Sequence, residues 1–252
     1  SRINPTSRVL PSAQPLTYRG DDRAVLLIHG FTGYPADMHY LAKELNGAGF
    51  TVRVPRLPGH GTDGKDFLSS DWRDWLRRSV DEYLELASAY REVYVAGLSM
   101  GGVLSVILAA TFSVSKVALL APALEVRNPL IALSGIIGVF RRKVPSGEHE
   151  YYKEPEKDYI SSEYWDYLWP GQSYGLHRLQ RMAKRRLEKL QGHVLTIISE
   201  EDETVPPKVA NLVETRATKA HTETFVLSKS GHVIARDSEA DTVAREVVRF
   251  FS

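Results

Sequence analysis

The chain of 252 residues contains no cysteine. This absence excludes disulfide bonds, thiolate metal ligands and a cysteine nucleophile. Neither sign of charge is in clear excess, because 32 Lys and Arg residues stand against 31 Asp and Glu residues, for a net charge of +1. The balance gives no electrostatic reason to expect a nucleic-acid partner. No apolar run reaches about 18 residues, so we expect no membrane-spanning segment.

The start of the chain also lacks a signal-peptide pattern, since Ser1–Pro5 is not a charged segment followed by an apolar one. We therefore expect a cytoplasmic protein, although the absence of an initiator Met leaves room for a removed leader. Hydrophobic residues make up 43% and charged residues 25% of the chain, which is ordinary for a globular protein. The length predicts a single domain over residues 1–252.

Short apolar runs alternate with segments of helical periodicity along most of the chain. The expected strands are Ala24–Ile28, Thr51–Pro55, Val93–Ala96, Lys116–Leu120, His193–Ile198 and Thr224–Leu227. The expected helices are Ala36–Gly47, Asp71–Tyr90, Gly101–Thr111 and Asp241–Phe251. This alternation predicts an α/β fold with a mostly parallel central sheet flanked by helices on both faces.

Residues 123–190 interrupt the alternation, and we interpret them as a cap inserted over the carboxyl edge of the sheet. The segment has an apolar part, then a part rich in tyrosine and tryptophan, then a basic amphipathic helix over Leu176–Leu190. The apolar side chains would line an acyl pocket, form a lid that opens at a lipid surface, or simply pack on the core; they are Leu130, Ile131, Leu133, Ile136, Ile137, Val139 and Phe140.

The basic residues of the last helix have two interpretations: transient contact with anionic lipid or a solvated face. They are Arg178, Arg181, Lys184, Arg185, Arg186 and Lys189. The solvated face is favoured, because apolar side chains at helical spacing predict a buried opposite side; these are Leu176, Leu179, Leu187 and Leu190.

The motif that carries chemistry is Gly97-Leu98-Ser99-Met100-Gly101, placed directly between an expected strand and an expected helix. A nucleophilic serine in this setting sits on a sharp, strained turn that the two glycines leave room for. Ser99 is therefore the candidate nucleophile. A plain glycine-rich turn is the alternative.

A serine hydroxyl needs a base, and in this type of site the acid precedes the histidine in the chain. His232 follows the last expected strand, and Asp202 follows the strand before it. Both loops lie at the same edge of the sheet as Ser99. The segment Asp-Glu-Thr-Val-Pro favours Asp202 as the acid, but Glu200, Glu201 and Glu203 compete with it, and His232 could be a structural residue.

An oxyanion is stabilised by backbone N–H groups that are already in place. One donor is expected from Met100, the residue after the nucleophile. The other is expected from Phe31, in the loop His29-Gly30-Phe31-Thr32-Gly33 after the first expected strand.

Five ordered motifs make the chain resemble the bacterial carboxylesterase and monoacylglycerol-lipase group of the α/β-hydrolase superfamily. Over about residues 20–252 they are Leu27–Gly33, Arg56–Gly61, Gly97–Gly102, Asp202–Pro206 and Ser230–Ile234. The resemblance implies a catalytic triad of Ser99, Asp202 and His232, with oxyanion donors at Phe31 and Met100. It also implies about eight strands, with the small cap between the sixth and seventh. His60, in the second motif, is expected to be structural rather than catalytic.

These observations predict a serine ester hydrolase, a carboxylesterase or lipase acting on short- to medium-chain acyl esters or monoacylglycerols. The predicted mechanism needs no metal or organic cofactor, and the expected partner is a small-molecule or lipid ester. The alternatives are hydrolysis of an amide, lactone or C–C bond, acyl transfer to another acceptor, or, more remotely, a non-catalytic binding protein on the same fold. The sequence does not specify an oligomeric state.

Overall fold

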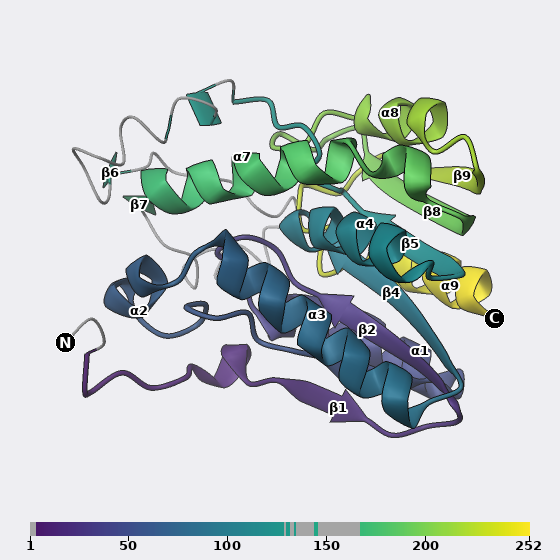
Figure 1. Ribbon diagram of the computed structural model, residues 1–252, viewed down its shortest axis with the longest axis horizontal. Coiled ribbons are helices and arrows are strands. Elements are labelled where there is room, and N and C mark those ends of the chain that lie inside the picture. Colours follow the sequence, from purple (N-terminus) through teal and green to yellow (C-terminus); the bar gives the residue numbers. More distant parts are fainter. Residues whose placement is uncertain (1–3, 129, 132–133, 135–143, 146–166) are drawn as a thin grey trace.

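The computed structural model describes residues 4–128, 130–131, 134, 144–145 and 167–252. Its main sheet has seven strands in the order β1-β3-β2-β4-β5-β8-β9 (Figure 1). The strands are β1 Leu16–Tyr18, β2 Arg23–Ile28, β3 Thr51–Val54, β4 Glu92–Leu98, β5 Lys116–Leu120, β8 Gly192–Ser199 and β9 Ala220–Leu227. A separate short pair joins β6 Val144–Pro145 to β7 Tyr167–Leu168. All six predicted strands are confirmed, and β1 is an additional one.

All neighbouring strands of the main sheet are parallel except β1, which is antiparallel to β3. The predicted mostly parallel α/β architecture is therefore confirmed. In the main sheet the described residues form seven strands, where the resemblance implied about eight. The segment with the expected cap consequently follows the fifth strand of the sheet and not the sixth. Proline explains why residues 4–15 add no strand, since Pro5, Pro11 and Pro15 lack the N–H that a ladder needs.

Helices cover both faces of the sheet (Figure 1). They are α1 His39–Gly47, α2 Gly64–Ser69, α3 Trp72–Ala89, α4 Met100–Phe112, α7 Pro170–Lys184, α8 Val209–Arg216 and α9 Ala240–Phe251. Short 3-10 turns occupy η1 Pro11–Ala13, η2 Pro35–Met38 and η5 Leu187–Lys189. Helices α3, α4, α7 and α8 pack on one face, whereas α1 and α9 pack on the other.

Strand β2 shows why the sheet is buried on both sides. Leu26 and Ile28 belong to the core under α3 and α4, while Val25 and Leu27 belong to the core under α1 and α9. A strand covered on both faces needs apolar residues at consecutive positions, which is the pattern of Ala24–Ile28.

The predicted basic helix over Leu176–Leu190 is present as α7, but α7 begins earlier and ends earlier than expected, at Pro170 and Lys184. Pro170 occupies the first position of α7, where its missing N–H costs nothing, and the chain turns to 3-10 geometry at Leu187. The predicted buried side is confirmed for Leu176, Leu179, Leu187 and Leu190. Arg178 and Arg181 are exposed, as a solvated face requires.

Most of the expected acyl-pocket residues lie outside the described part of the chain: Leu133, Ile136, Ile137, Val139 and Phe140. Of the others, Leu130 is exposed and Ile131 packs against the core. Across the residues that the structure describes, no helix combines the length and the apolar character that crossing a bilayer demands.

Candidate active site

Ser99 occupies the sharp turn between β4 and α4. Its backbone angles, φ 57° and ψ −115°, lie in a region that residues other than glycine rarely adopt. The turn is held on both sides of the serine. The Ser99 N–H donates to the Leu120 carbonyl at 2.9 Å, and the Ser99 carbonyl accepts from the N–H groups of Gly102 and Ala123 at 3.0 and 3.1 Å. Strand β5 and the chain after it therefore fix the position of the serine.

The two glycines of the motif are required by close backbone approach. A Cβ on Gly97 would lie 2.0 Å from the Gly101 carbonyl oxygen, and a Cβ on Gly101 would lie 2.0 Å from the Ile28 carbonyl oxygen. Both distances are far below van der Waals contact. The small residues thus let α4 begin directly against β2 and β4, with its N-terminus beside Ser99.

The three residues predicted to work together form one hydrogen-bonded chain. His232 Nε2 lies 2.8 Å from Ser99 Oγ, and His232 Nδ1 lies 2.9 Å from Asp202 Oδ2. Asp202 and His232 are 2% and 9% exposed, while Ser99 is partly exposed. With Nδ1–H donating to Asp202, Nε2 is free to accept the serine proton.

Asp202 is the acid at this position, whereas Glu200, Glu201 and Glu203 are exposed on the same loop. Burial alone would raise the pKa of Asp202. The facing His232, by charge and hydrogen bond, and the N–H groups of Val205 and Thr204 outweigh burial and lower this pKa. The two N–H groups donate to Asp202 Oδ1 at 2.9 and 2.8 Å. The carboxylate is consequently ionised at neutral pH with its second oxygen aimed at His232.

The two expected oxyanion donors belong to residues adjacent to Ser99 and to Gly30 in the chain. Met100 is the first residue of α4, so its N–H has no acceptor within the helix. Gly30 packs against the serine, since a Cβ at this position would lie 3.3 Å from Ser99 Cβ and 3.9 Å from Ser99 Oγ. Phe31, the next residue, is therefore placed beside the nucleophile. Thr32 follows with a positive φ of 59°, which turns the loop sharply at this point.

His29 and His60 are buried in an aromatic cluster next to this loop. His29 Nδ1 donates to the Gly30 carbonyl, and Nε2 accepts from the Leu57 N–H at 3.0 Å, which fixes a neutral tautomer. Burial lowers the pKa of His29 to about 4 and holds the pKa of His60 well below its usual value. The His60 ring packs edge-on against His29, Phe67 and Trp75. This environment agrees with the structural role expected for His60.

Arg127 positions the acid loop, although the sequence contains no motif around it. Its Nε donates to the Asp202 carbonyl at 3.1 Å, and its backbone N–H donates to the Thr204 carbonyl at 2.9 Å. A second link lies nearby, where Lys208 contacts Glu125 at 2.9 Å. The start of the segment after β5 is thereby tied to the loop that supplies the acid.

Glu239 and Asp237 hold the histidine loop in a similar way. The Glu239 carboxylate accepts from the N–H groups of Lys229 and Ser230 at 2.9 and 2.8 Å and from the Ser230 hydroxyl at 2.8 Å. Asp237 accepts from the Gly231 N–H at 2.7 Å. Reasoning from the sequence missed both carboxylates, because acids five and seven residues after a histidine have no distinctive spacing.

Ser99, His232 and Asp202 form a hydrogen-bonded chain at the carboxyl ends of the strands of a mostly parallel sheet, an arrangement typical of an α/β hydrolase with a serine site. Among the described residues, no group of three or more His, Asp or Glu side chains could hold a metal ion. The chain belongs to the alpha/beta hydrolase family, whose model matches residues 25–246.

Relatives resemble the protein over nearly its whole length. It is 27% identical to a carboxylesterase of Bacillus subtilis (strain 168), over 94% of this chain and 95% of the relative. It is 28% identical to a thermostable monoacylglycerol lipase of Bacillus sp. (strain H-257), over 97% of this chain and 96% of the relative. A solved structure described with the metagenome-derived lipolytic enzymes LipS and LipT superposes with a TM-score of 0.88 at 28% identity. That match covers 96% of this chain and 98% of the other.

Proposed function

We propose that the protein is a serine carboxylic-ester hydrolase in which Ser99 is the nucleophile, His232 the general base and Asp202 the orienting acid. One observation carries the proposal: the continuous hydrogen-bonded chain from Ser99 Oγ through His232 to the buried Asp202. A serine hydroxyl is a weak nucleophile until such a base accepts its proton. The strained turn at Ser99 supports the same role, because strain of this kind persists at functional sites.

The reaction proceeds in two acyl-transfer steps. Ser99 Oγ attacks the ester carbonyl carbon while His232 takes the hydroxyl proton, and the carbonyl oxygen becomes an oxyanion beside the N–H groups of Phe31 and Met100. Collapse of this intermediate breaks the ester C–O bond, and His232 returns its proton to the leaving alcohol. Water, deprotonated by His232, then attacks the acyl-enzyme and releases the acid and free Ser99. Asp202 holds the imidazole in the required tautomer and stabilises its charged form.

The substrate class that best fits the chain is a short- to medium-chain acyl ester or a monoacylglycerol. Both curated relatives, named as a carboxylesterase and a monoacylglycerol lipase, align over nearly the full chain. We assign residues 123–190 as the cap that borders the acyl side of this site within a single domain. Its first residues support this assignment, since Arg127 contacts the acid loop directly.

The test is hydrolysis of p-nitrophenyl esters from acetate to palmitate, together with monoacyl- and triacylglycerols. We expect activity with the shorter esters and monoacylglycerols, and a loss of at least about 10³-fold in kcat for Ser99→Ala. The matched control is Ser88→Ala, an exposed serine on α3, which should keep the wild-type rate. Equal rates for wild type and Ser99→Ala would contradict the proposal. Activity on amides or lactones in place of esters would assign another reaction to the same serine.

A further inference from the structure

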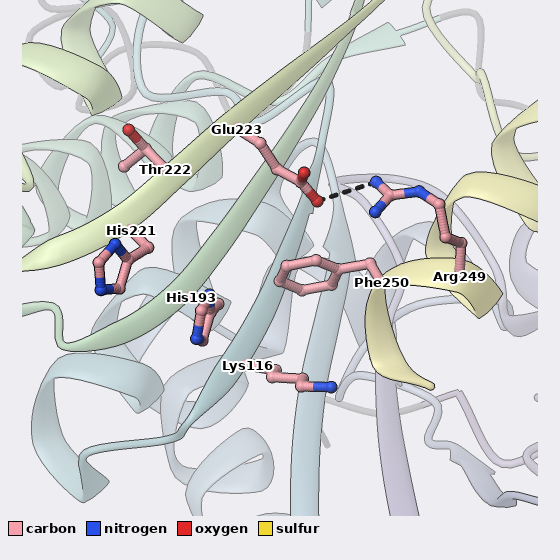
Figure 2. A pocket seen from close by; sticks show the side chains of 7 residues that line it. All are labelled: Lys116, His193, His221, Thr222, Glu223, Arg249 and Phe250. Carbon is pink, nitrogen blue, oxygen red and sulfur yellow. Dashed lines mark hydrogen bonds and ion pairs between the residues drawn. The ribbon is translucent and has the colours of Figure 1, made fainter.

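A hollow with a volume of about 370 Å³ lies at the amino-terminal ends of the strands, whereas Ser99 lies at their carboxyl-terminal ends. Figure 2 shows its lining residues: Lys116, His193, His221, Thr222, Glu223, Arg249 and Phe250. His193 lies near the amino end of β8. Ser199 is the last residue of β8, directly before the loop that contains Asp202, and it lies six residues of strand, or about 20 Å, from His193. The hollow is therefore distinct from the site around Ser99.

Three side chains in the hollow form a row across neighbouring strands. Lys116 of β5 is paired in register with His193 of β8, and His193 is paired with His221 of β9. The two imidazole rings stack with centroids 5.1 Å apart and an angle of 25° between their planes. Strands lie about 4.8 Å apart, so three nitrogen-bearing groups are held side by side on one face of the sheet.

The carboxylates near the row already form ion pairs with another cation, Arg249. Glu223 contacts Arg249 at 2.9 Å, and Glu246, on the same helix as Arg249, contacts it at 3.0 Å. The Lys116 ammonium donates to the Phe251 carbonyl at 3.2 Å, which is a neutral group. Within the described ranges, neither Lys116 nor the two histidines forms an ion pair with a carboxylate. The row therefore presents the positively charged Lys116 beside two imidazole rings, which favours a bound anion.

We propose that the hollow is a binding site for a phosphate or phosphomonoester anion. Lys116 supplies a charged donor, and His193 and His221 supply ring nitrogens beside it in the same row. Phe250 provides an apolar wall beside the row, which suits the organic part of a phosphomonoester. A metal ion fits the row less well, because the Lys116 ammonium is next in register to His193 and repels a cation.

The proposal is tested by calorimetric titration with inorganic phosphate and phenyl phosphate at low ionic strength. The variants are Lys116→Gln, His193→Gln and His221→Gln, and the control is Lys43→Gln, an exposed lysine on α1. We expect saturable binding by wild type and the control, and binding at least about tenfold weaker in each of the three variants. Ester hydrolysis and the Tm of each variant should match wild type, which separates this site from the proposed reaction at Ser99.

Two further measurements complete the test. Vesicles with and without phosphatidic acid distinguish a lipid headgroup from a free ligand, since both carry the same phosphate chemistry. Vesicle binding that is lost in Lys116→Gln would support the site with a lipid source. Absence of saturable binding to phosphate, phenyl phosphate and vesicles would overturn the proposal. Zn²⁺ binding that is lost in His193→Gln, without any phosphate binding, would overturn it in favour of a metal site.

Discussion

Ser99 combines an unfavourable backbone conformation with a favourable set of contacts. A non-glycine residue at φ 57° and ψ −115° costs about 1–3 kcal/mol, and the structure offsets this through hydrogen bonds at both its N–H and its carbonyl. The strained turn presents the hydroxyl to His232 and leaves the N–H of Met100 without a helical acceptor. One conformational feature would thus serve both the proposed nucleophile and the proposed oxyanion donor at Met100.

Asp202→Asn tests the role of the acid. An amide nearly preserves the shape of the side chain, but it stabilises the wrong tautomer of His232 and removes the charge that faces the imidazolium. We expect kcat to fall by about 10³- to 10⁴-fold while the fold is retained. Steady-state kinetics on a p-nitrophenyl ester would measure this effect.

The control for this variant is Glu201→Gln, an exposed acid next to Asp202 in the chain. Its kcat should stay within about twofold of wild type, because surface carboxylates contribute little. The opposite pattern, with Glu201→Gln inactive and Asp202→Asn active, would show that the wrong acid has been assigned.

At the scale of elements, the sequence predicts those helices and strands whose signal lies within a few neighbouring residues. Strand β2 is a continuous apolar run, and Ser99 sits in a motif between a strand and a helix, so both follow from neighbouring residues. Two other strands were not fully predicted, since Leu16–Tyr18 is only three residues long and the first half of β9 is polar. These segments become strands because a partner strand, distant in the sequence, offers its hydrogen-bonding edge.

The supports of the catalytic loops were missed for the same reason. Arg127 meets Asp202 across 75 positions of sequence, and their contact depends on how the chain leaves β5. Glu239 binds the turn before His232 through backbone N–H groups, which every residue except proline has and which therefore leave no sequence signal. The positions of the loops at one sheet edge could be predicted, but the groups that hold them could not.

Glu239→Gln tests the support of the histidine loop. The amide is a weaker acceptor and carries no charge, so the turn over Lys229 and Ser230 should loosen and His232 should lose its exact alignment with Ser99. We expect kcat to fall about ten- to a hundredfold with KM nearly unchanged, because both Glu239 carboxylate oxygens bond to Ser228, Lys229 and Ser230 of the loop. Asp241→Asn, an exposed acid in the first turn of the same helix, should leave kcat unchanged. Equal kinetic effects of the two variants would contradict this role for Glu239.

Arg127→Met tests the support of the acid loop. Methionine keeps much of the side-chain length but cannot donate to the Asp202 carbonyl, so the loop should lose one of its two links to Arg127. We expect kcat to fall about tenfold without a comparable change in KM. Lys208→Gln is the control, because the exposed ion pair with Glu125 should contribute little. A wild-type kcat for Arg127→Met would show that the loop holds its position without this contact.

At the scale of the whole molecule, two buried histidines make folding stability depend on pH. The pKa of His29 is about 4 in the folded protein against an ordinary value of 6.5, and the pKa of His60 is lowered in the same direction. Between these values the unfolded chain binds a proton that the folded chain excludes, so the free energy of unfolding falls as pH decreases.

This linkage predicts a stability that is complete above about pH 6.5 and declines as the pH falls toward 4. For His29 alone the full loss is about 3 kcal/mol, from the 2.5-unit difference in pKa. Urea unfolding at several pH values across this range would measure it. A free energy of unfolding that stays constant between about pH 6.5 and 4.5 would contradict the buried, neutral state of both histidines.

The candidate active site and the hollow lie at opposite ends of the strands of one sheet. Loops after β2, β4, β8 and β9 converge around Ser99 at the carboxyl edge, while the row that begins at Lys116 lies at the amino edge. The mostly parallel sheet between them is buried on both faces, which keeps Ser99, His232 and Asp202 in fixed relation.

The central claim, that Ser99 is the nucleophile of an ester hydrolase, is tested most directly by reaction with diethyl p-nitrophenyl phosphate. This reagent transfers a diethylphosphoryl group to an activated serine and releases p-nitrophenol, which leaves a stable adduct. We expect one diethylphosphoryl group per chain, located on Ser99 by peptide mass spectrometry, with ester hydrolysis lost in proportion to labelling. Labelling at another residue, or full ester hydrolysis after complete labelling of Ser99, would contradict this claim.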